Sequence, residues 1–352
     1  MQSSRRDFLK QVTITGLAAG VSASELFSVE KEPHRKLGIA ISSYAIRSRS
    51  FRKQGFRDPI RFVDFCHQRG AGGVQLPIGA RDKDYARKLR KSIEKIGMFL
   101  EASMSTPRKK SDVERFEAEV KTAKAAGATI IRTVCLGGRR YETFKKASEF
   151  TAFKKHSLER LRMAEPIVAR HKMRLAIENH KDFRTDELLG MLKRIDSQQV
   201  GICVDTGNNL ALLEDPLEMT RAMAPLAFAC HLKDMGVEES TDGFLLSEVP
   251  LGTGSLDLQG IVTTLRKANS KIQFTLEMIT RDPLRIPCLS EGYWETMQHV
   301  SGKDLARTLT WVRKHRRKTS LPRITKLTQE KKLAIEEANV RQSLQFAKAK
   351  LS

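Results

Sequence analysis

The sequence predicts an α/β fold, a (β/α)₈ TIM barrel with a C-terminal helical extension. Two observations support this fold class. From residue 37 onward, short apolar runs alternate with longer amphipathic segments, which is typical of repeated βα units around a parallel sheet. Eight such units follow one another over about 280 residues, the usual size of a (β/α)₈ barrel.

The expected strands are mostly continuous apolar runs, as buried parallel strands are. They cover residues 37–43, 73–76, 98–103, 130–134, 174–178, 200–204, 227–232 and 272–277. The clearest helices are often opened by Ser, Thr or Asp and closed by Gly. They cover residues 58–69, 83–96, 112–126, 153–171, 185–195 and 256–267.

A doubly wound open sheet is the structural alternative. It usually carries a glycine-rich phosphate turn after its first strand, and no such turn follows residues 37–43. The stretch Gly252-Thr-Gly-Ser lies late in the chain and is interpreted as a turn before the eighth helix. Long segments, 233–255 and 278–302, follow the seventh and eighth strands, where a barrel places substrate-shaping loops.

The two ends of the chain differ from the barrel. Arg5-Arg6 and the weakly apolar stretch 12–23 indicate that residues 1–30 are a twin-arginine-type export signal. We therefore expect a periplasmic or otherwise exported bacterial protein that meets the twin-arginine translocase during export. The barrel is expected at 37–317, and residues 318–352 form a basic helical extension. That extension could pack on the barrel or on a second subunit, so a homo-oligomer is possible.

Composition excludes several classes of protein. The five cysteines are odd in number and form no CxxC pair, which excludes a disulfide-stapled scaffold and gives no sign of structural zinc. The sequence has no uninterrupted run of 18 or more apolar residues, so no membrane-spanning helix is expected. The formal net charge of +22 invites a nucleic-acid function, but much of the basic excess lies in the two ends of the chain.

Four consecutive expected strands end near a side chain that can bind metal. They are Glu178, Asp205, His231 and Glu277. Because the carboxyl ends of all barrel strands open onto one face, these side chains can converge. Three carboxylates at a desolvated site repel one another unless a cation compensates. Three carboxylates and one imidazole suit one divalent ion, Mn²⁺, Mg²⁺, Co²⁺ or Zn²⁺.

The segments around these residues carry a family resemblance. Ile177-Glu178-Asn179-His180, Val204-Asp205-Thr206-Gly207-Asn208, His231-Leu232-Lys233-Asp234 and Leu276-Glu277 resemble, in that order, the xylose isomerase-like superfamily of sugar isomerases and epimerases. The resemblance spans about residues 37–311 and implies that the four residues hold one divalent ion. It also implies a ketose, aldose or polyol as substrate. The signal and residues 281–294 resemble an exported bacterial branch of that superfamily.

The expected reaction is isomerisation or epimerisation beside a carbonyl, through an enediolate. Glu178 and Glu277 are the expected acid/base pair, one for each face of the substrate. The candidates for substrate binding are His180, Asn208, Lys233 and Trp294. A surface lysine paired with Asp234 is the alternative interpretation of Lys233.

Other functions stay open. Asn208 stands where relatives with an epimerase pattern often carry a histidine, which leaves room for a lyase or dehydratase acting on oxo-sugars or polyols. An apurinic endonuclease-like nuclease would need extra histidines after strands two, three and six, so no specific nucleic-acid partner is expected. A non-catalytic carbohydrate-binding barrel is the third alternative.

Overall fold

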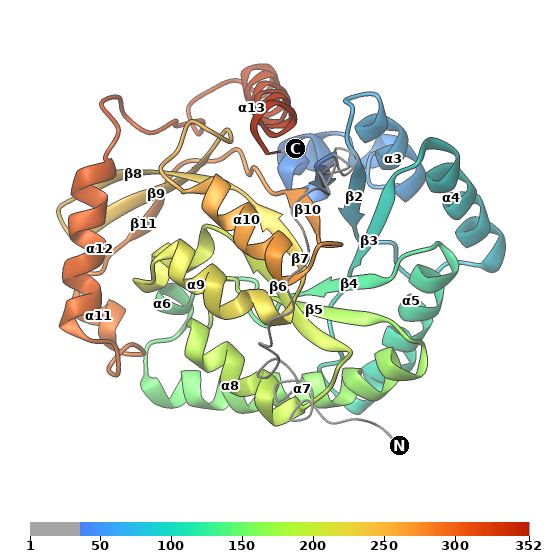
Figure 1. Cartoon of the computed structure of the whole chain (residues 1–352), viewed down its shortest axis with the longest axis horizontal. Coiled ribbons are helices and arrows are strands. Elements are labelled where there is room, and N and C mark those ends of the chain that lie inside the picture. The colour runs from blue at the N-terminus through green and yellow to red at the C-terminus, as the bar shows by residue number, and fades with distance from the viewer. Residues whose placement is uncertain (1–35, 352) are drawn as a thin grey trace, which may run out of the picture.

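The computed structural model describes residues 36–351. Eight parallel strands close into a barrel in the order β1-β10-β7-β6-β5-β4-β3-β2 (Figure 1). The strands are β1 Gly38–Ala40, β2 Gly73–Leu76, β3 Phe99–Ser103, β4 Ile130–Thr133, β5 Arg174–Glu178, β6 Val200–Asp205, β7 Ala227–Leu232 and β10 Gln273–Leu276. The expected fold class is confirmed. The export signal expected at 1–30 lies outside the described residues and stays a prediction.

The first strand is shorter than expected, because residues Ile41–Tyr44 form a 3₁₀ turn. Ser43 explains why the chain turns there. Its hydroxyl donates to the carbonyl oxygen of Leu276 at 2.8 Å and accepts from the backbone N–H of Met278 at 3.0 Å. These two hydrogen bonds tie the chain just after β1 to the end of β10.

Helices surround the barrel. They are α2 Ala45–Ser50, α3 Pro59–His67, α4 Lys83–Ile96, α5 Val113–Ala125, α6 Arg140–Thr143, α7 Ala147–Arg170, α8 Thr185–Ile195, α9 Pro216–Met223, α10 Leu258–Ala268, α11 Glu291–Trp294, α12 Gly302–His315 and α13 Gln329–Lys350. Several begin at an aspartate whose carboxylate accepts backbone N–H groups, as Asp58 does for α3 and Asp215 for the unexpected α9. In the described part of the chain, no helix is long and apolar enough to cross a membrane.

The segments expected to be long loops instead contain a second sheet. β8 Asp234–Ser240, β9 Gly243–Val249 and β11 Leu284–Ile286 form an antiparallel sheet in the order β11-β9-β8. Alternate residues of this sheet, including Met235, Val237, Phe244 and Leu246, are buried in a second hydrophobic cluster that α12 also joins. This period-two alternation explains why the segments pair as strands rather than staying irregular.

The C-terminal extension packs against the barrel. Val340 and Ala347 of its helix, α13, and Leu351 just after that helix belong to the main hydrophobic core. The carboxylate of Glu336 on the same helix accepts the backbone N–H groups of Ile46 and Arg47, at 2.6 and 2.9 Å. The extension is therefore an integral part of the barrel's outer layer, whereas a role in dimerisation stays a prediction.

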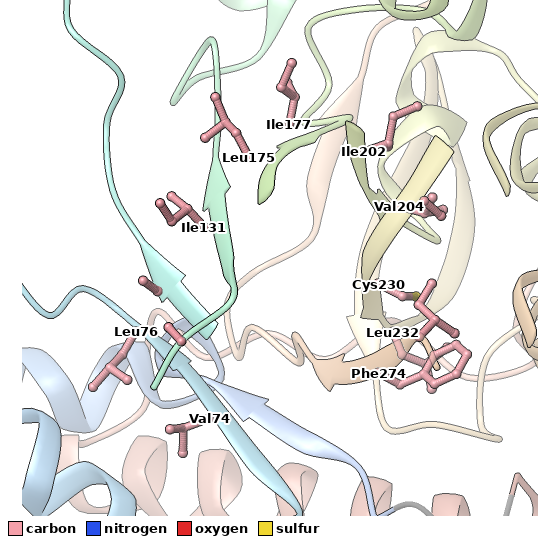
Figure 2. Packing of buried hydrophobic residues seen from close by; sticks show 14 of the residues in the cluster. Val74, Leu76, Ile131, Leu175, Ile177, Ile202, Val204, Cys230, Leu232 and Phe274 are labelled. Carbon is pink, nitrogen blue, oxygen red and sulfur yellow. The ribbon is translucent and has the colours of Figure 1, made fainter. Parts of the chain in front are cut away.

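The alternation of side chains along each strand decides which residues point into the barrel. On β5, Leu175 and Ile177 belong to the main core between strands and helices (Figure 2). Ala176 belongs instead to a small inner cluster with Cys203 of β6 and Ala229 of β7. The side chains two positions after these three lie on the same side of their strands. Those residues are Glu178, Asp205 and His231.

Candidate active site

The four acidic and histidine side chains meet at one end of the barrel. Candidate ligand atoms of Glu178, Asp205, His231 and Glu277 all lie within 4.8 Å of one another, and all four residues are buried. The Nδ1 atom of His231 lies 3.2 Å from Glu178 Oε2, 3.5 Å from Glu277 Oε2 and 4.0 Å from Asp205 Oδ2. The structure therefore brings together side chains that lie up to 99 residues apart in the sequence, with the imidazole nitrogen facing three carboxylates.

One buried atom in this cluster, His231 Nδ1, has no hydrogen bond. Asp205 Oδ2, 4.0 Å away, is paired with the ammonium of Lys233 at 2.8 Å. Buried polar atoms are nearly always hydrogen-bonded, so an imidazole nitrogen left without a partner among three carboxylates needs an explanation. The nitrogen and the carboxylate oxygens have lone pairs that can bind a cation, and an oxygen-rich set with one imidazole suits Mn²⁺, Mg²⁺, Co²⁺ or Zn²⁺. The residues present therefore fit a divalent ion.

A buried chain of side chains orients the histidine. His231 Nε2 lies 2.6 Å from Gln75 Oε1, and Gln75 Nε2 donates to Glu101 Oε2 at 2.8 Å. The bond to Glu101 directs the amide oxygen of Gln75 toward the imidazole, so Nε2 carries the proton. The lone pair of a neutral His231 is then on Nδ1, the atom that faces the carboxylates. Such supporting groups set the orientation and basicity of metal-binding histidines.

Two cations compensate the carboxylates. Lys233 Nζ lies 2.7 Å from Glu277 Oε2 and 2.8 Å from Asp205 Oδ2, and Arg132 Nε donates to Glu178 Oε2 at 2.5 Å. Burial raises the pKa of Asp205 to about 6, although Lys233 opposes that change. Burial also disfavours the ionised form of Glu277, but Lys233 and His231 outweigh it and hold the pKa of Glu277 well below its usual value.

The structure excludes the alternative interpretation of Lys233 as a surface lysine. Its side chain is 1% exposed, and its ammonium contacts the site rather than Asp234. The carboxylate of Asp234 accepts backbone N–H groups, including those of Gly252 and Gly254 at 3.0 and 2.9 Å. It thus fixes the turn that was expected at Gly252-Thr-Gly-Ser.

The other candidates for substrate binding lie at different places. Asn208 is in the site, where its Nδ2 donates to Glu178 Oε1 at 3.2 Å. His180 follows β5, and its Nδ1 lies 2.9 Å from the carbonyl oxygen of Leu136. Burial lowers the pKa of His180 to about 4, so its imidazole is neutral near pH 7. Trp294 is half-buried against the second hydrophobic cluster and donates to the carbonyl oxygen of Cys288. Its role in substrate binding stays a prediction.

Sequence reasoning missed several residues around the site. A single sequence does not separate Arg132 from surface arginines, and it assigned no role to Gln75, Glu101 or Lys181. Strand alternation supplies one signal, since residues 75, 101 and 132 occupy inward positions of β2, β3 and β4. For Lys181, which lies in a loop after β5, the sequence contains no comparable signal.

Replacing Gln75 by leucine is expected to weaken divalent-metal binding about 10- to 100-fold, the usual effect of losing a group that supports a metal-binding histidine. The substitution removes the acceptor for His231 Nε2 while the barrel keeps an apolar side chain of similar size. Titration of metal-free protein with Mn²⁺ by calorimetry checks this expectation. Gln198→Leu, on the α8–β6 loop, is the matched control. Equal Mn²⁺ affinity in Gln75→Leu and the wild type would contradict the role of Gln75.

Two curated proteins are similar to parts of the chain. The 3-oxo-isoapionate decarboxylase of Pectobacterium atrosepticum is 32% identical over 123 residues, covering 34% of this chain and 45% of that protein. The uncharacterized protein YihM of Escherichia coli is 25% identical over 89 residues, covering 25% of this chain and 27% of that protein. The chain thus spans less than half the length of each of these relatives.

Solved structures show the same fold at low sequence identity. The D-psicose 3-epimerase determined with D-fructose has a TM-score of 0.58 at 14% identity, covering 89% of this chain and 98% of that one. A xylose isomerase-like TIM barrel protein from Mycobacterium smegmatis, in complex with magnesium, has a TM-score of 0.53 at 17% identity. The match covers 78% of this chain and 97% of that one. The probable 3-DHS dehydratase AsbF from Bacillus anthracis has a TM-score of 0.51 at 16% identity. The match covers 76% of this chain and 99% of that one.

A family comparison covers most of the barrel. The family described as "Xylose isomerase-like TIM barrel" matches residues 63–313, more than two thirds of the chain. The matched range includes seven of the eight barrel strands and all four residues of the buried cluster. The chain therefore belongs to the xylose isomerase-like TIM barrel family.

Proposed function

We propose that the protein is a divalent-metal-dependent enzyme that acts on a sugar or polyol derivative, at a carbon beside a carbonyl group. One observation carries this proposal. His231 Nδ1, which has no hydrogen bond, faces the carboxylates of Glu178, Asp205 and Glu277 at the ends of successive barrel strands. Active sites of such barrels lie at this end of the strands. Family membership supports the substrate class, since its structural neighbours include sugar epimerases.

The first candidate reaction is isomerisation or epimerisation through an enediolate. Glu178, Asp205, His231 and Glu277 would hold the ion, which when bound supplies a Lewis acid for a carbonyl oxygen of the substrate. Glu178 and Glu277 are the proposed acid/base pair, because they come from strands on different sides of the cluster. Lys233 and Arg132 would stabilise negative charge that develops on the substrate oxygens.

The second candidate is a lyase, and a specific feature of the site favours it. Both oxygens of Glu277 already accept hydrogen bonds, from Ser42 and Lys233, and both oxygens of Glu178 accept from Asn208 and Arg132. Carboxylates held in this way are weak bases, since each donor stabilises the ionised form. A lyase that breaks a carbon–carbon bond, such as a decarboxylase acting on an oxo-sugar acid, depends less on a strong carboxylate base, because its electron pair comes from the broken bond and not from a C–H bond.

Decarboxylation illustrates this second candidate. The bond between the carboxylate carbon and its neighbour breaks, the electron pair stays on that neighbour in conjugation with the carbonyl, carbon dioxide leaves, and a proton is added. The similarity to a 3-oxo-isoapionate decarboxylase supports a reaction of this class.

One experiment tests the proposed function and distinguishes isomerisation or epimerisation from decarboxylation. Protein stripped with a chelator and reloaded with Mn²⁺ is incubated in D₂O with ketoses, 3-oxo sugars, 3-oxo sugar acids and polyols. We expect about one bound ion per chain, and turnover only with that ion. An isomerase or epimerase places deuterium on carbon without changing the carbon count, whereas a decarboxylase also releases carbon dioxide.

The stoichiometry also tests the remaining alternatives. No bound ion after reconstitution with Mn²⁺, Co²⁺ or Zn²⁺ would contradict the proposal and favour a non-catalytic carbohydrate-binding barrel. About three ions per chain would favour the nuclease, whose chemistry uses several metal ions. Within residues 36–351, one cluster of at least three metal-binding side chains is present, which is consistent with a single ion.

A further inference from the structure

Lys181 is a buried cation without an acidic partner. It lies in the loop after β5 with a positive φ of 57°, and its residue is 3% exposed. Its Nζ donates to Asn208 Oδ1, and it forms no ion pair with any residue in the described part of the chain. An ammonium removed from water without a carboxylate partner is costly, so a retained one points to a ligand that supplies the missing charge.

The neighbouring cations differ from Lys181 in this respect. Arg132 contacts Glu178, Lys233 contacts Glu277 and Asp205, and Arg281 contacts Glu248. Lys181 is linked to this network through an amide alone, because Asn208 Oδ1 also lies 3.4 Å from Lys233 Nζ. Two ammonium groups therefore share one neutral oxygen, an arrangement in which like charges repel.

The ion pairs around the cluster show which charge lacks a partner. The carboxylates of Glu178, Asp205, Glu277 and Glu248 are paired with Arg132, Lys233 and Arg281, which leaves no carboxylate for Lys181. A divalent ion would add two more positive charges near this ammonium. Burial and the nearby Lys233 lower the pKa of Lys181 to about 8, which agrees with an ammonium that lacks compensation.

We propose that the substrate carries a carboxylate group and that Lys181 binds this carboxylate beside the metal cluster. This inference rests on the proposed function and narrows its substrate class to acidic sugar derivatives, such as oxo-sugar acids. A carboxylate matches the single unpaired ammonium. A phosphate dianion commonly needs several donors, such as a glycine-rich loop or an arginine fork, whereas the cations near Lys181, Lys233 and Arg281, are already paired with carboxylates. Asn208 orients the ammonium, because its Oδ1 accepts from Lys181 while its Nδ2 donates to Glu178 of the cluster.

Matched pairs of ligands test the proposal. The probes are D-erythronate with erythritol, D-xylonate with D-xylitol, and D-gluconate with D-glucitol, because each acid differs from its alcohol in one terminal group. Binding to Mn²⁺-loaded protein is measured by calorimetry at constant ionic strength. We expect one or more of the acids to bind about tenfold more tightly than its alcohol, the effect of one new charge-assisted contact.

Variants assign that preference to Lys181. Lys181→Met and Lys181→Gln remove the charge. As a control, Lys193→Gln makes the same lysine-to-glutamine substitution on the exposed face of α8. We expect both Lys181 variants to reduce the acid-to-alcohol preference to about twofold or less while Lys193→Gln keeps it. Circular dichroism identifies a variant that does not fold, and the other Lys181 variant then decides.

The outcomes separate this inference from the proposed function. No acid preference in the wild type, including no measurable binding, would overturn the inference, as would a preference that persists in a folded Lys181 variant. A preference for D-glucose 6-phosphate over D-glucose without any preference for the acids would assign Lys181 to phosphate and overturn it as well. Failure of the wild type to bind Mn²⁺ would instead overturn the proposed function. The affinities of each acid and its matched alcohol are then compared on metal-free protein, and the same outcomes decide the role of Lys181.

Discussion

Replacing Glu277 by glutamine is expected to lower kcat/KM about a thousandfold and to weaken Mn²⁺ binding by about 100-fold, because the side chain would serve both the ion and the chemistry. Its Oε2 lies 3.5 Å from His231 Nδ1 and accepts from Lys233 at 2.7 Å. Glutamine keeps the size of the side chain but removes its negative charge. The amide therefore contributes less to cation binding and cannot carry a proton between substrate atoms.

Elemental mass spectrometry of the purified variant measures its metal content, and steady-state kinetics on a substrate found by the deuterium screen measures kcat/KM. Glu295→Gln is the matched control, since Glu295 is exposed just after α11 and undergoes the same chemical change. Unchanged metal content together with unchanged activity in Glu277→Gln would contradict the assignment of Glu277. Lost activity with normal metal content would assign it to catalysis alone.

Replacing Lys233 by methionine is expected to destabilise the metal-free protein by about 3–5 kcal/mol, the usual cost of removing one partner from a buried ion pair. The ammonium lies 2.8 Å from Asp205 Oδ2 and 2.7 Å from Glu277 Oε2, so its loss removes the ammonium paired with both carboxylates. A divalent ion supplies the missing charge. Mn²⁺ should therefore stabilise this variant more than it stabilises the wild type.

Urea unfolding of both proteins, with a chelator and with excess Mn²⁺, measures this difference. Lys193→Met on the exposed face of α8 is the control and should change the unfolding free energy by about 0.5 kcal/mol or less. If Lys233→Met loses the same stability with Mn²⁺ as without it, Lys233 does not compensate the charge of the metal cluster. A contribution of Lys233 to packing alone would then explain the loss.

Local patterns in the chain were sufficient to predict the barrel. Buried parallel strands appear as short apolar runs, and β2, β5 and β7 begin and end where those runs do. The second sheet was missed, because β8 and β9 were interpreted as a loop. Met235 and Val237 of β8 alternate with more polar neighbours, a period-two pattern that predicts a strand. In β9, Leu245 between Phe244 and Leu246 hides this alternation.

The amino-acid order alone also located the four side chains of the cluster. Each lies within one residue of the end of an apolar strand, and equivalent ends of parallel barrel strands must meet on one face. This inference needed no knowledge of packing, since strand direction and side-chain alternation are local properties of the backbone.

Folding in three dimensions decided which groups surround that cluster. Gln75 reaches His231 across 156 residues, Ser42 reaches Glu277 across 235, and Lys181 meets Asn208 across 27. No local pattern encodes such pairs, because they depend on how strands close into a barrel and which rotamers the neighbours allow. The chain thus specifies locally where a cation could bind, whereas its tertiary contacts specify the protonation, the charge balance and the unpaired Lys181 that the proposed chemistry requires.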